Sequence, residues 1–513
     1  MHKNTNIKVI LFLCAFFLSS VALFGLSSQG ISYTTKNNKL DQTMPTIQFT
    51  TGIIPSYTLQ QMIDNFNANF SSSYGFKVHY DGSFDIASPH DYFVTDFKAK
   101  STFLDVIYMD VLWPAEFAHE GWLLPLDNSF NISYQAHFLQ GQIQAATYNG
   151  HMYAVPWWHA GGMLYYRTDV LQYATQNGII NDPGAKPPTT WNELTSWTTA
   201  MMTNKTLTEK FNLTAGFVWQ GESYEGLMCD FMEYLGATGT HSFLNADQSQ
   251  PIFNTNAGVS QSLSYMKSLL NNSVSPQSVL NFTEESARSV WNAGNAIFMR
   301  NWPYAYVLSL HSLYLNGSLN SVSPNVQQFN VTSMPEANSS IINPDTSCLG
   351  GYQLGVSAYS KYPNQAKKFV MWLTNAQNQL QNFLGSGEMP TIKSLYNNLT
   401  LINSKQGYAS KFLPIFEHTI PRPISPYYNQ MSPIITSTIH SYLTGNLTLT
   451  NALNKLQKDV MKVINNQPFQ SIITTKPTTI TSVITTSTPG FEFCSILTLG
   501  LLSVYTLKKK KLH

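Results

Sequence analysis

The sequence predicts an α/β protein built from two packing units. The chain has 513 residues, which is too long for one hydrophobic core. Strand-like alternation at 46–50 is followed by an apolar helical face over 59–70 and by a second strand at 76–80. This βαβ order predicts a parallel or mixed sheet. The stretch from Tyr148 to Arg167 then has the features of a crossover from one unit to the other.

Within that crossover, a proline precedes three ring side chains, and two glycines follow. Pro156 fixes its own φ and donates no ladder hydrogen bond, so we expect the strand before it to stop or to change sheet there. Gly161 and Gly162 permit close backbone approach. Flat rings at a seam between two units suit a ring-shaped, hydroxyl-rich ligand such as a sugar, and a buried aromatic cluster in one core is the alternative. The rings are Trp157, Trp158 and His159.

The next element is a predicted helix over 90–100, followed by the continuous apolar run 105–109 that is typical of a buried parallel strand. Asp110 stands at the carboxyl end of that strand, where the ligands of open α/β sheets collect. It is therefore a site candidate. A helix N-cap before Pro114 is the alternative role.

Further along, Thr190 and Glu193 have the spacing of a capping box at a helix start. Trp219 and Glu222 lie at the end of the predicted strand 217–220, and Trp302 follows the predicted strand 296–299. Gly350 and Gly351 permit close backbone approach in a third strand. The predicted strands are 217–220, 296–299 and 348–356, and the predicted helices are 225–235, 262–270, 284–293, 364–374 and 451–464.

The composition is unusually poor in charge, with 11% charged residues and a formal net charge of +1, against about 25% in ordinary domains. No basic stripe is present, which argues against a nucleic-acid partner. A surface of uncharged polar groups stays soluble when carboxylates are protonated, so it also suits a protein that faces an acidic medium outside the cell. Of the four cysteines, only Cys229 and Cys348 belong to the globular part, and we expect two free thiols rather than a disulfide. No CxxC pattern supports a zinc or redox site.

Catalytic patterns are absent from the sequence: there is no GxSxG elbow, no HExxH and no phosphate-binding loop. Asp110 and Glu222 are the one pair that could serve a glycoside hydrolase, which needs two carboxylates in one cleft. His159 lacks a partner at metal-ligand spacing, so a stacked or hydrogen-bonded histidine is favoured. The sequence predicts neither a metal nor a cofactor.

Both ends of the chain carry apolar segments that we separate from the fold. Residues 1–28 predict a signal peptide, 468–490 a Thr/Ser/Pro-rich stalk suited to O-glycosylation, and 491–507 a transmembrane anchor with its lysine-rich end in the cytoplasm. A processed sorting tail of archaeal type is the alternative for the C-terminus. The globular body is thus predicted to be extracellular and anchored to the cytoplasmic membrane. N-glycosylation sequons occur at Asn69, Asn131, Asn204, Asn212, Asn271, Asn281, Asn316, Asn330, Asn338, Asn398 and Asn446.

Seven pieces over about residues 45–466 resemble one known family. They are MDVLWPAEFAHEGWLLPLD from Met109, MYAVP…LYYRTDVL from Met152, PPTTWNEL from Pro187, GFVWQGESYEGLMCDFMEY from Gly216, TEESARSVWNAGNAIFMRNWPYAY from Thr283, LGGYQLGVS from Leu349 and RPISPYY from Arg422. In these pieces the chain resembles the extracellular solute-binding proteins (family 1) of ABC sugar importers, in particular archaeal trehalose/maltose-binding proteins.

The resemblance implies a two-lobed periplasmic-binding-protein fold of type II, whose lobes close on a sugar through hinge crossings. It implies that lobe 1 comprises 45–155 and 304–355, and that lobe 2 comprises 156–303 and 356–467. The crossings are expected near Pro156, Pro303 and Gly355. The implied partners are a sugar ligand and an ABC permease whose cytoplasmic ATPase is a separate chain, and the implied state is a monomer without catalytic activity.

The resemblance also implies site residues. Asp110 would accept sugar hydroxyls, Trp158 would stack, and Trp302 and Gly351 would line the cleft. Chemistry and neighbourhood alone support Trp113, Trp157, His159, Trp219, Glu222 and Gly350. The chain departs from the family pattern at Ala160 and Met299, where carboxylates are usual, so the identity of the sugar stays open. An exported glycan-degrading enzyme and a glycan-adhesion envelope protein are the alternative functions.

Overall fold

A computed structural model describes residues 44–51, 57–82, 88–181, 184, 186–271, 274–315, 329–341, 345–404 and 407–465. The chain divides after Met44, and the compact unit Pro45–His513 holds every helix and strand given below. The predicted signal peptide, stalk and C-terminal apolar segment lie outside the described residues. Within the described ranges, no helix combines the length and the hydropathy needed to cross a bilayer.

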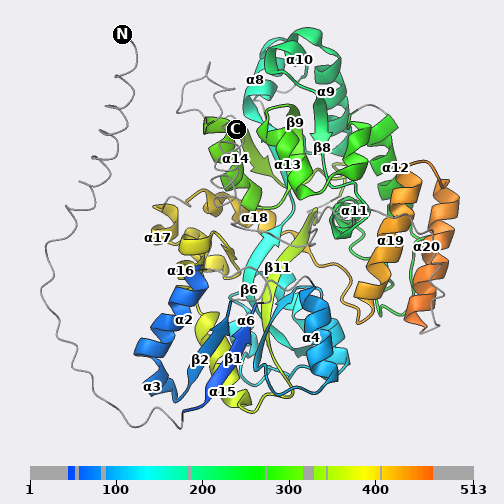
Figure 1. Cartoon of the computed structure of the whole chain (residues 1–513). Coiled ribbons are helices and arrows are strands. Elements are labelled where there is room, and N and C mark those ends of the chain that lie inside the picture. The colour runs from blue at the N-terminus through cyan, green and yellow to red at the C-terminus, as the bar shows by residue number, and fades with distance from the viewer. Residues whose placement is uncertain are drawn as a thin grey trace, which may run out of the picture. The chain divides into compact units, whose positions relative to one another are not determined.

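The larger sheet of the described chain has seven strands in the order β12-β6-β11-β3-β1-β2, with β13 beside β11 (Figure 1). β1 runs parallel to β2 and β3, which confirms the predicted βαβ start, and β11 runs antiparallel to β3 and β6. The strands are β1 (Thr46–Thr50), β2 (Lys77–Asp81), β3 (Val106–Asp110), β6 (Ala154–Gly161), β11 (Ser347–Val356), β12 (Met389–Pro390) and β13 (Thr419–Ile420).

Helices from two stretches that are far apart in the sequence pack on this sheet, and we call the assembly lobe 1 (the described residues within 45–161 and 347–420). Phe49 of β1 and Phe66 of α2 both contact Phe369 of α15, with ring centroids 5.6 and 6.0 Å apart. The helices are α2 (Tyr57–Asn69), α3 (Ser71–Tyr74), α4 (Pro89–Lys98), α5 (Pro114–His119), α6 (Ile132–Gln135), α7 (Gln140–Ala145), α15 (Pro363–Leu373), α16 (Ala376–Ser386), α17 (Leu399–Ile402), α18 (Leu413–Phe416) and the 3-10 turns η2 (Lys393–Asn397) and η3 (Gly407–Phe412). A small hairpin adds β4 (Thr147–Tyr148) and β5 (His151–Met152).

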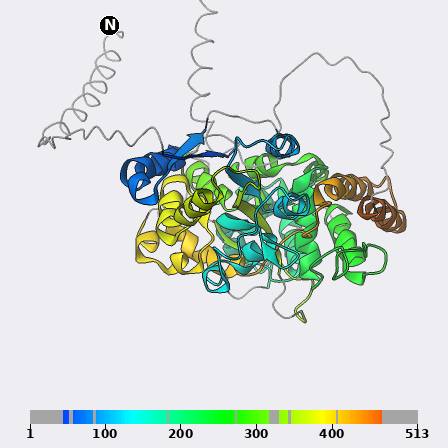
Figure 2. The ribbon, with the colours of Figure 1, turned by 90° about the horizontal axis from the view of Figure 1, so that it is seen from below.

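The smaller sheet of the described chain has four strands in the order β10-β7-β9-β8 and forms lobe 2 with its helices (the described residues within 163–315, 329–332 and 428–464). The strands are β7 (Met163–Arg167), β8 (Ala215–Val218), β9 (Ala296–Asn301) and β10 (Phe329–Thr332). The helices are α8 (Thr168–Gln176), α9 (Trp191–Thr203), α10 (Lys205–Phe211), α11 (Glu225–Ala237), α12 (Ala257–Asn271), η1 (Gln277–Asn281), α13 (Glu284–Asn292), α14 (Tyr304–Leu315), α19 (Tyr428–Leu443) and α20 (Leu449–Ile464). Helices α19 and α20 lie side by side (Figures 1 and 2), and α19 also packs on α11 and α12. The predicted Thr190–Glu193 capping box is confirmed at the start of α9.

The strand through Pro156 does not stop there, contrary to the sequence prediction. β6 continues to Gly161, and the register shifts so that Trp158 faces Tyr352 while Pro156 faces Gln353. The shift leaves Trp157 as the extra residue of a bulge, which tolerates a proline beside it because the ladder is already interrupted. The change of sheet comes at Gly162, where a Cβ would lie 1.7 Å from Oε1 of buried Glu233.

The lobe boundaries also differ from those implied by the resemblance. Helix α14 (Tyr304–Leu315) directly follows β9 of lobe 2, and β10 (Phe329–Thr332) is also in lobe 2 because it pairs with β7. The chain returns to lobe 1 at β11 and leaves it for the last time between β13 and α19. Pro303 and Gly355 are therefore not crossings: Pro303 joins β9 to α14, and Gly355 lies within β11, opposite Ile107 and Ala154.

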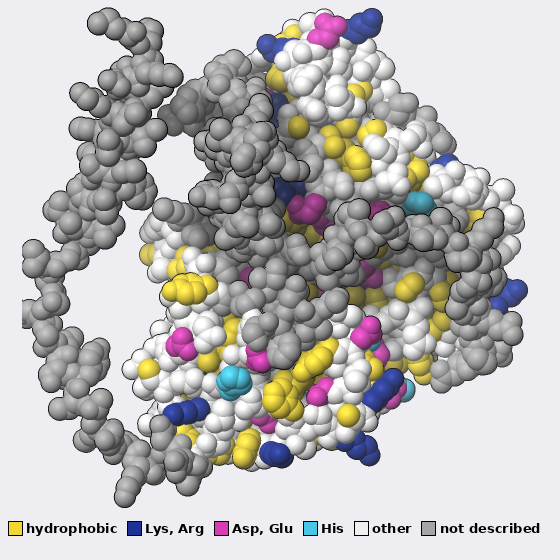
Figure 3. Space-filling view, in the orientation of Figure 1, with side chains coloured by type: hydrophobic (Ala, Val, Ile, Leu, Met, Phe, Trp, Pro, Cys, Tyr) yellow, Lys and Arg dark blue, Asp and Glu magenta, His cyan; other side chains and the backbone are white. Residues whose placement is uncertain are grey.

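The low charge of the composition is visible on the face of the molecule drawn in Figure 3. Lysine, arginine, aspartate and glutamate side chains are scattered there among uncharged polar and backbone atoms. Cys229 and Cys348 are free and buried, as predicted.

Candidate functional site

The crossing strands of lobe 1 present a row of side chains on one face. Asp110 of β3 is the register partner of Tyr352 of β11, and Tyr352 is the partner of Trp158 of β6. Register partners in adjacent strands point to the same face. The Trp158 indole stacks on Tyr352 with ring centroids 4.9 Å apart, and its Nε1 donates to the hydroxyl of Tyr108 at 2.5 Å. Asp110 therefore stands at one end of an aromatic row, which we call the crossing-strand face.

Trp302 reaches this same face from lobe 2. A Cβ on Gly350 would lie 3.1 Å from Cζ3 of Trp302 and 3.3 Å from Cβ of Ala160. The small residues Gly350 and Ala160 therefore leave space for the Trp302 indole. Nε1 of Trp302 donates to Glu284 at 3.2 Å. On its ring lies Arg300, with Cζ 4.1 Å from the ring centroid, a cation–π contact. The structure thus brings Trp158 and Trp302 together.

Gly351 shapes the backbone of the face. Its φ of 113° is one that side chains other than glycine rarely adopt, and a Cβ there would lie 2.2 Å from the carbonyl oxygen of Trp158. Its own carbonyl accepts from the Val111 amide at 3.2 Å. This glycine lets β11 approach both β6 and the turn after β3.

The Asp110 carboxyl occupies a confined place but is still 24% exposed. Its Oδ1 accepts from the Leu112 amide at 3.1 Å, while the N-cap position of α5 is Trp113. Asp110 is therefore not the N-cap of α5. Burial raises the pKa of Asp110 to about 6, although Arg422, with Nη2 3.9 Å from Oδ1, opposes the rise. A carboxylate held in this way is able to accept hydrogen bonds from the hydroxyls of a ligand.

Arg422 joins the two lobes at the edge of the crossing-strand face. Its Nη1 donates to Glu225 of α11 at 2.7 Å, and its Nη2 donates to the carbonyl of Leu349 at 3.0 Å. Its buried Nε has no hydrogen-bond partner within the described residues. Sequence reasoning did not single out Arg422. The available indication was an arginine flanked by Pro421 and Pro423 in a chain that is poor in charge.

Two of the predicted site residues on β6 lie elsewhere. Trp157 is a fully buried bulge residue. His159 is on the opposite face from Trp158, where its ring lies 4.3 Å from that of Phe416 and its Nδ1 lies 3.2 Å from Nε2 of Gln142. Burial lowers the pKa of His159 to about 3, which keeps the imidazole neutral.

The remaining predicted residues are Trp219, Glu222 and Trp113. Trp219 is fully buried in lobe 2, where Nε1 donates to Ser275 at 3.0 Å. Glu222 is exposed. Trp113 is half-buried after Asp110 and packs edge-on against His90, with ring centroids 5.5 Å apart. The structure therefore groups Asp110, Trp158, Trp302, Gly350 and Gly351 on the crossing-strand face, while Trp157, His159 and Trp219 are buried away from it.

A second carboxyl near the aromatic row was missed in the sequence. Glu388 follows α16 and directly precedes β12, the strand that pairs with Trp158 and His159. Its Oε2 accepts from Nδ2 of Asn382 at 2.5 Å. Burial raises the pKa of Glu388 to about 7 against the hydrogen bonds of Asn382 and Ser386. Nothing in the local sequence, GSGEMPT, marks this glutamate as different from a surface residue.

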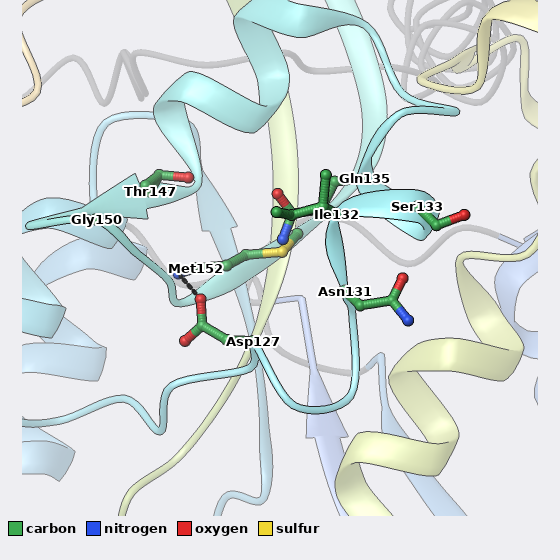
Figure 4. Close-up of a pocket in the computed structure, with 8 residues that line it drawn as sticks. All are labelled: Asp127, Asn131, Ile132, Ser133, Gln135, Thr147, Gly150 and Met152. Carbon is green, nitrogen blue, oxygen red and sulfur yellow. Dashed lines mark hydrogen bonds between the residues drawn. The ribbon is translucent and has the colours of Figure 1, made fainter.

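A pocket of about 470 Å³ opens elsewhere in lobe 1 (Figure 4). Asp127 on its wall accepts from the Met152 amide at 3.1 Å. None of the predicted site residues lines it. Its lining residues are Asp127, Asn131, Ile132, Ser133, Gln135, Thr147, Gly150 and Met152. Within the described ranges, no group of three or more histidine, cysteine, aspartate or glutamate side chains is placed to hold a metal ion.

Comparison with known proteins decides the family. The pattern of the bacterial extracellular solute-binding proteins matches residues 61–407. The chain belongs to this family. A probable ABC transporter-binding protein of Deinococcus radiodurans is 32% identical over 370 residues, which cover 71% of this chain and 81% of that protein.

Solved structures of solute-binding proteins share the two-lobed fold. T. maritima MalE3 with bound maltose is 28% identical, with 81% of this chain and 98% of that chain covered and a TM-score of 0.63. The sugar-binding protein MalE of Xanthomonas citri is 17% identical, with 82% and 98% covered and a TM-score of 0.66, and it supports the fold alone. The predicted type II fold is thus confirmed for the described residues of this solute-binding protein.

Proposed function

We propose that this solute-binding protein is the extracellular sugar receptor of an ABC importer. It captures a di- or oligosaccharide of the trehalose, maltose or maltodextrin type and delivers it to a permease driven by a separate cytoplasmic ATPase. The observation that carries the proposal is the crossing-strand face, where indoles from both lobes meet a carboxylate and an arginine. Aromatic faces and hydrogen-bonding groups in one crevice are what a sugar requires. The similarity to a maltose-bound protein supports the same class of ligand.

Each residue of the face has a role in this proposal. Asp110 accepts hydrogen bonds from sugar hydroxyls, and the unpartnered Nε of Arg422 donates to a ligand oxygen. Trp158 and Trp302 supply apolar ring contacts. Gly350 leaves the space for the Trp302 ring, and Gly351 lets β11 approach β6. Trp157, Trp219 and His159 are given no ligand contact, because their side chains are buried away from the face.

Lobe movement belongs to the proposal because Trp158 and Trp302 are only 6% and 4% exposed. A sugar reaches them when the lobes part, and it then stabilises the closed form that docks on the permease. Hydrogen bonds between the two lobes would stabilise the closed form. Nδ2 of Asn429 in α19, for example, donates to Glu116 of α5 at 2.6 Å.

The cellular setting is part of the same proposal. Residues 1–28 direct export, and 491–507 anchor a monomeric, glycosylated body outside the cytoplasmic membrane, as in archaeal receptors. The protein has no catalytic activity of its own. Incubation with maltodextrins followed by product analysis tests this point, because cleavage would favour a glycan-degrading enzyme instead. A glycan-adhesion protein would differ in small-angle scattering, since it should not compact when free sugar is added.

A thermal-shift screen of the purified chain tests the binding function. The panel contains trehalose, maltose, maltotriose, longer glucans, glucose and a peptide mixture. A sugar at 100 times its Kd should add about 2.7 kcal/mol to the free energy of unfolding. Trp158→Ala should weaken that sugar's binding by roughly 1–3 kcal/mol. Stabilisation by peptides and by no sugar would refute the proposal.

A further inference from the structure

The pairing of β12 with β6 places Glu388 on the crossing-strand face. Met389 is the register partner of His159, and Pro390 is the partner of Trp158. In an antiparallel pair, one step back along one strand is one step forward along the other, so Glu388 comes opposite Ala160. Side chains alternate along a strand, which puts Glu388 on the same face as Pro390 and therefore as Trp158.

This register adds a second row to the face. Ala160 is also the partner of Gly350, so the row reads Glu388, Ala160, Gly350. The last two residues have almost no side chain, and the Trp302 ring lies against Gly350. Glu388 is consequently the one residue of this row that offers a hydrogen-bond acceptor on its side chain, next to an aromatic surface built from both lobes.

The environment of Glu388 is costly for a carboxylate. Asn382 is its neutral partner, and within the described residues no lysine, arginine or histidine forms an ion pair with it. Burial of a carboxylate without a cation is unfavourable. Gly387, with φ of 81°, ends α16 and turns the chain so that Glu388 leads into β12. The fold thus holds the Glu388 carboxyl at the edge of the crossing-strand face, and no cation among the described residues offsets the cost of burying it.

The separation from Asp110 bears on the size of the ligand. Asp110 is on β3 and Glu388 leads into β12, with β11 and β6 between them. Three strand spacings of about 4.8 Å place the two backbones about 14 Å apart. That span exceeds one sugar ring, so the two carboxyls contact different parts of a ligand.

We propose that Glu388 is a second hydroxyl acceptor of the sugar site and that it selects di- and oligosaccharides over single sugars. The inference depends on the proposed function, because it deepens the account of the same site. Asp110 holds one end of the saccharide, the indoles contact its rings, and Glu388 holds a ring at the other end. A sugar too short to reach Glu388 gains nothing from it.

Glu388→Gln tests the proposal because it removes the charge and keeps the shape. Calorimetric titration of the full chain with glucose, maltose, maltotriose and maltotetraose gives the dependence of Kd on sugar length. The variant should lose about tenfold or more in affinity for the longest sugars, as a hydrogen bond to a charged group is worth about 1.5–3 kcal/mol. It should leave the shortest sugar that binds unchanged. Glu388→Asp keeps the charge on a shorter side chain, so its affinity for the longest sugars should lie between those of the unmodified chain and of Glu388→Gln.

Glu417→Gln is the matched control, since it removes an exposed carboxylate from lobe 1 and should change no affinity. Melting temperatures of all variants check the fold. If Glu388→Gln binds every sugar like the unmodified chain, or weakens all lengths equally, the inference is overturned while the proposed function stands. If the unmodified chain binds no sugar, the proposed function falls and this inference falls with it.

Discussion

Replacing Asp110 with asparagine should stabilise the protein at neutral pH while weakening sugar binding. Burial raises the pKa of the Asp110 carboxyl from its ordinary value of 3.8 to about 6. The folded state therefore binds this proton more tightly than the unfolded state does. Unfolding releases that proton between these pH values, and stability therefore falls as the pH rises through this window. A pKa difference of about 2, at about 1.4 kcal/mol for each pKa unit, lowers the free energy of unfolding by about 3 kcal/mol at pH 7.

Asparagine avoids this cost and keeps an oxygen for the Leu112 amide. Urea denaturation should therefore find Asp110→Asn more stable than the unmodified chain by about 3 kcal/mol at pH 7, and by almost nothing near pH 4. Asp64→Asn, which changes an exposed carboxylate on α2, is the control and should show no such trend. A variant that is less stable at pH 7, or that gains equally at both pH values, would show that the Asp110 charge is well compensated and that the reasoning is wrong.

Three further predictions follow from local geometry. Gly162→Ala should destabilise lobe 2 by about 3–5 kcal/mol in urea denaturation, because its Cβ displaces Glu233 from buried Arg300. Gly184→Ala, whose Cβ would meet only the Lys186 side chain, at an ordinary contact distance of 3.6 Å, should not. Burial lowers the pKa of His90, but the Glu116 and Asp91 carboxylates outweigh it and raise the pKa. His90→Gln should thus lower the melting temperature at pH 5.5 and have little effect at pH 8.5, and an equal loss at both values would contradict the ion pair. Thr190→Ala removes the α9 cap and should cost about 1 kcal/mol; a neutral result would mean that the cap is not needed in the folded protein.

Local patterns were sufficient to predict much of the fold. The strand at 46–50, the helix after it and the Thr190 capping box depend on neighbours within a few residues, and the structure has them. Pro156 was different, since a proline in a strand is compatible with either an end or a bulge. The choice depended on β11, which lies far away in the chain and skips Trp157. A sequence pattern does not contain that partner.

The site shows the same division. Asp110 was recognisable because a carboxylate at a strand end is a local pattern. Arg422 and Glu388 acquire their positions from partners that the fold brings in, such as Glu225, which is 197 residues from Arg422. Trp219 has the same local appearance as Trp302, a tryptophan after a strand, yet only Trp302 has a glycine facing it. The difference is a property of the opposite strand, so the sequence around each tryptophan could not separate the two.

In the proposed function, the division of the indoles between the lobes gives closure its ligand dependence. Trp302 is held from within lobe 2, by the Arg300 guanidinium on its ring and by Glu284 on its Nε1. Trp158 is held from within lobe 1, by the stack on Tyr352 and the hydroxyl of Tyr108. Both sets of supports lie within one lobe, so parting the lobes would leave them intact while it separates Trp302 from Gly350. Each ring therefore keeps its orientation in an open form, and a sugar that contacts both rings has full affinity only for the closed form. That difference in affinity is what a ligand needs to shift the equilibrium towards closure.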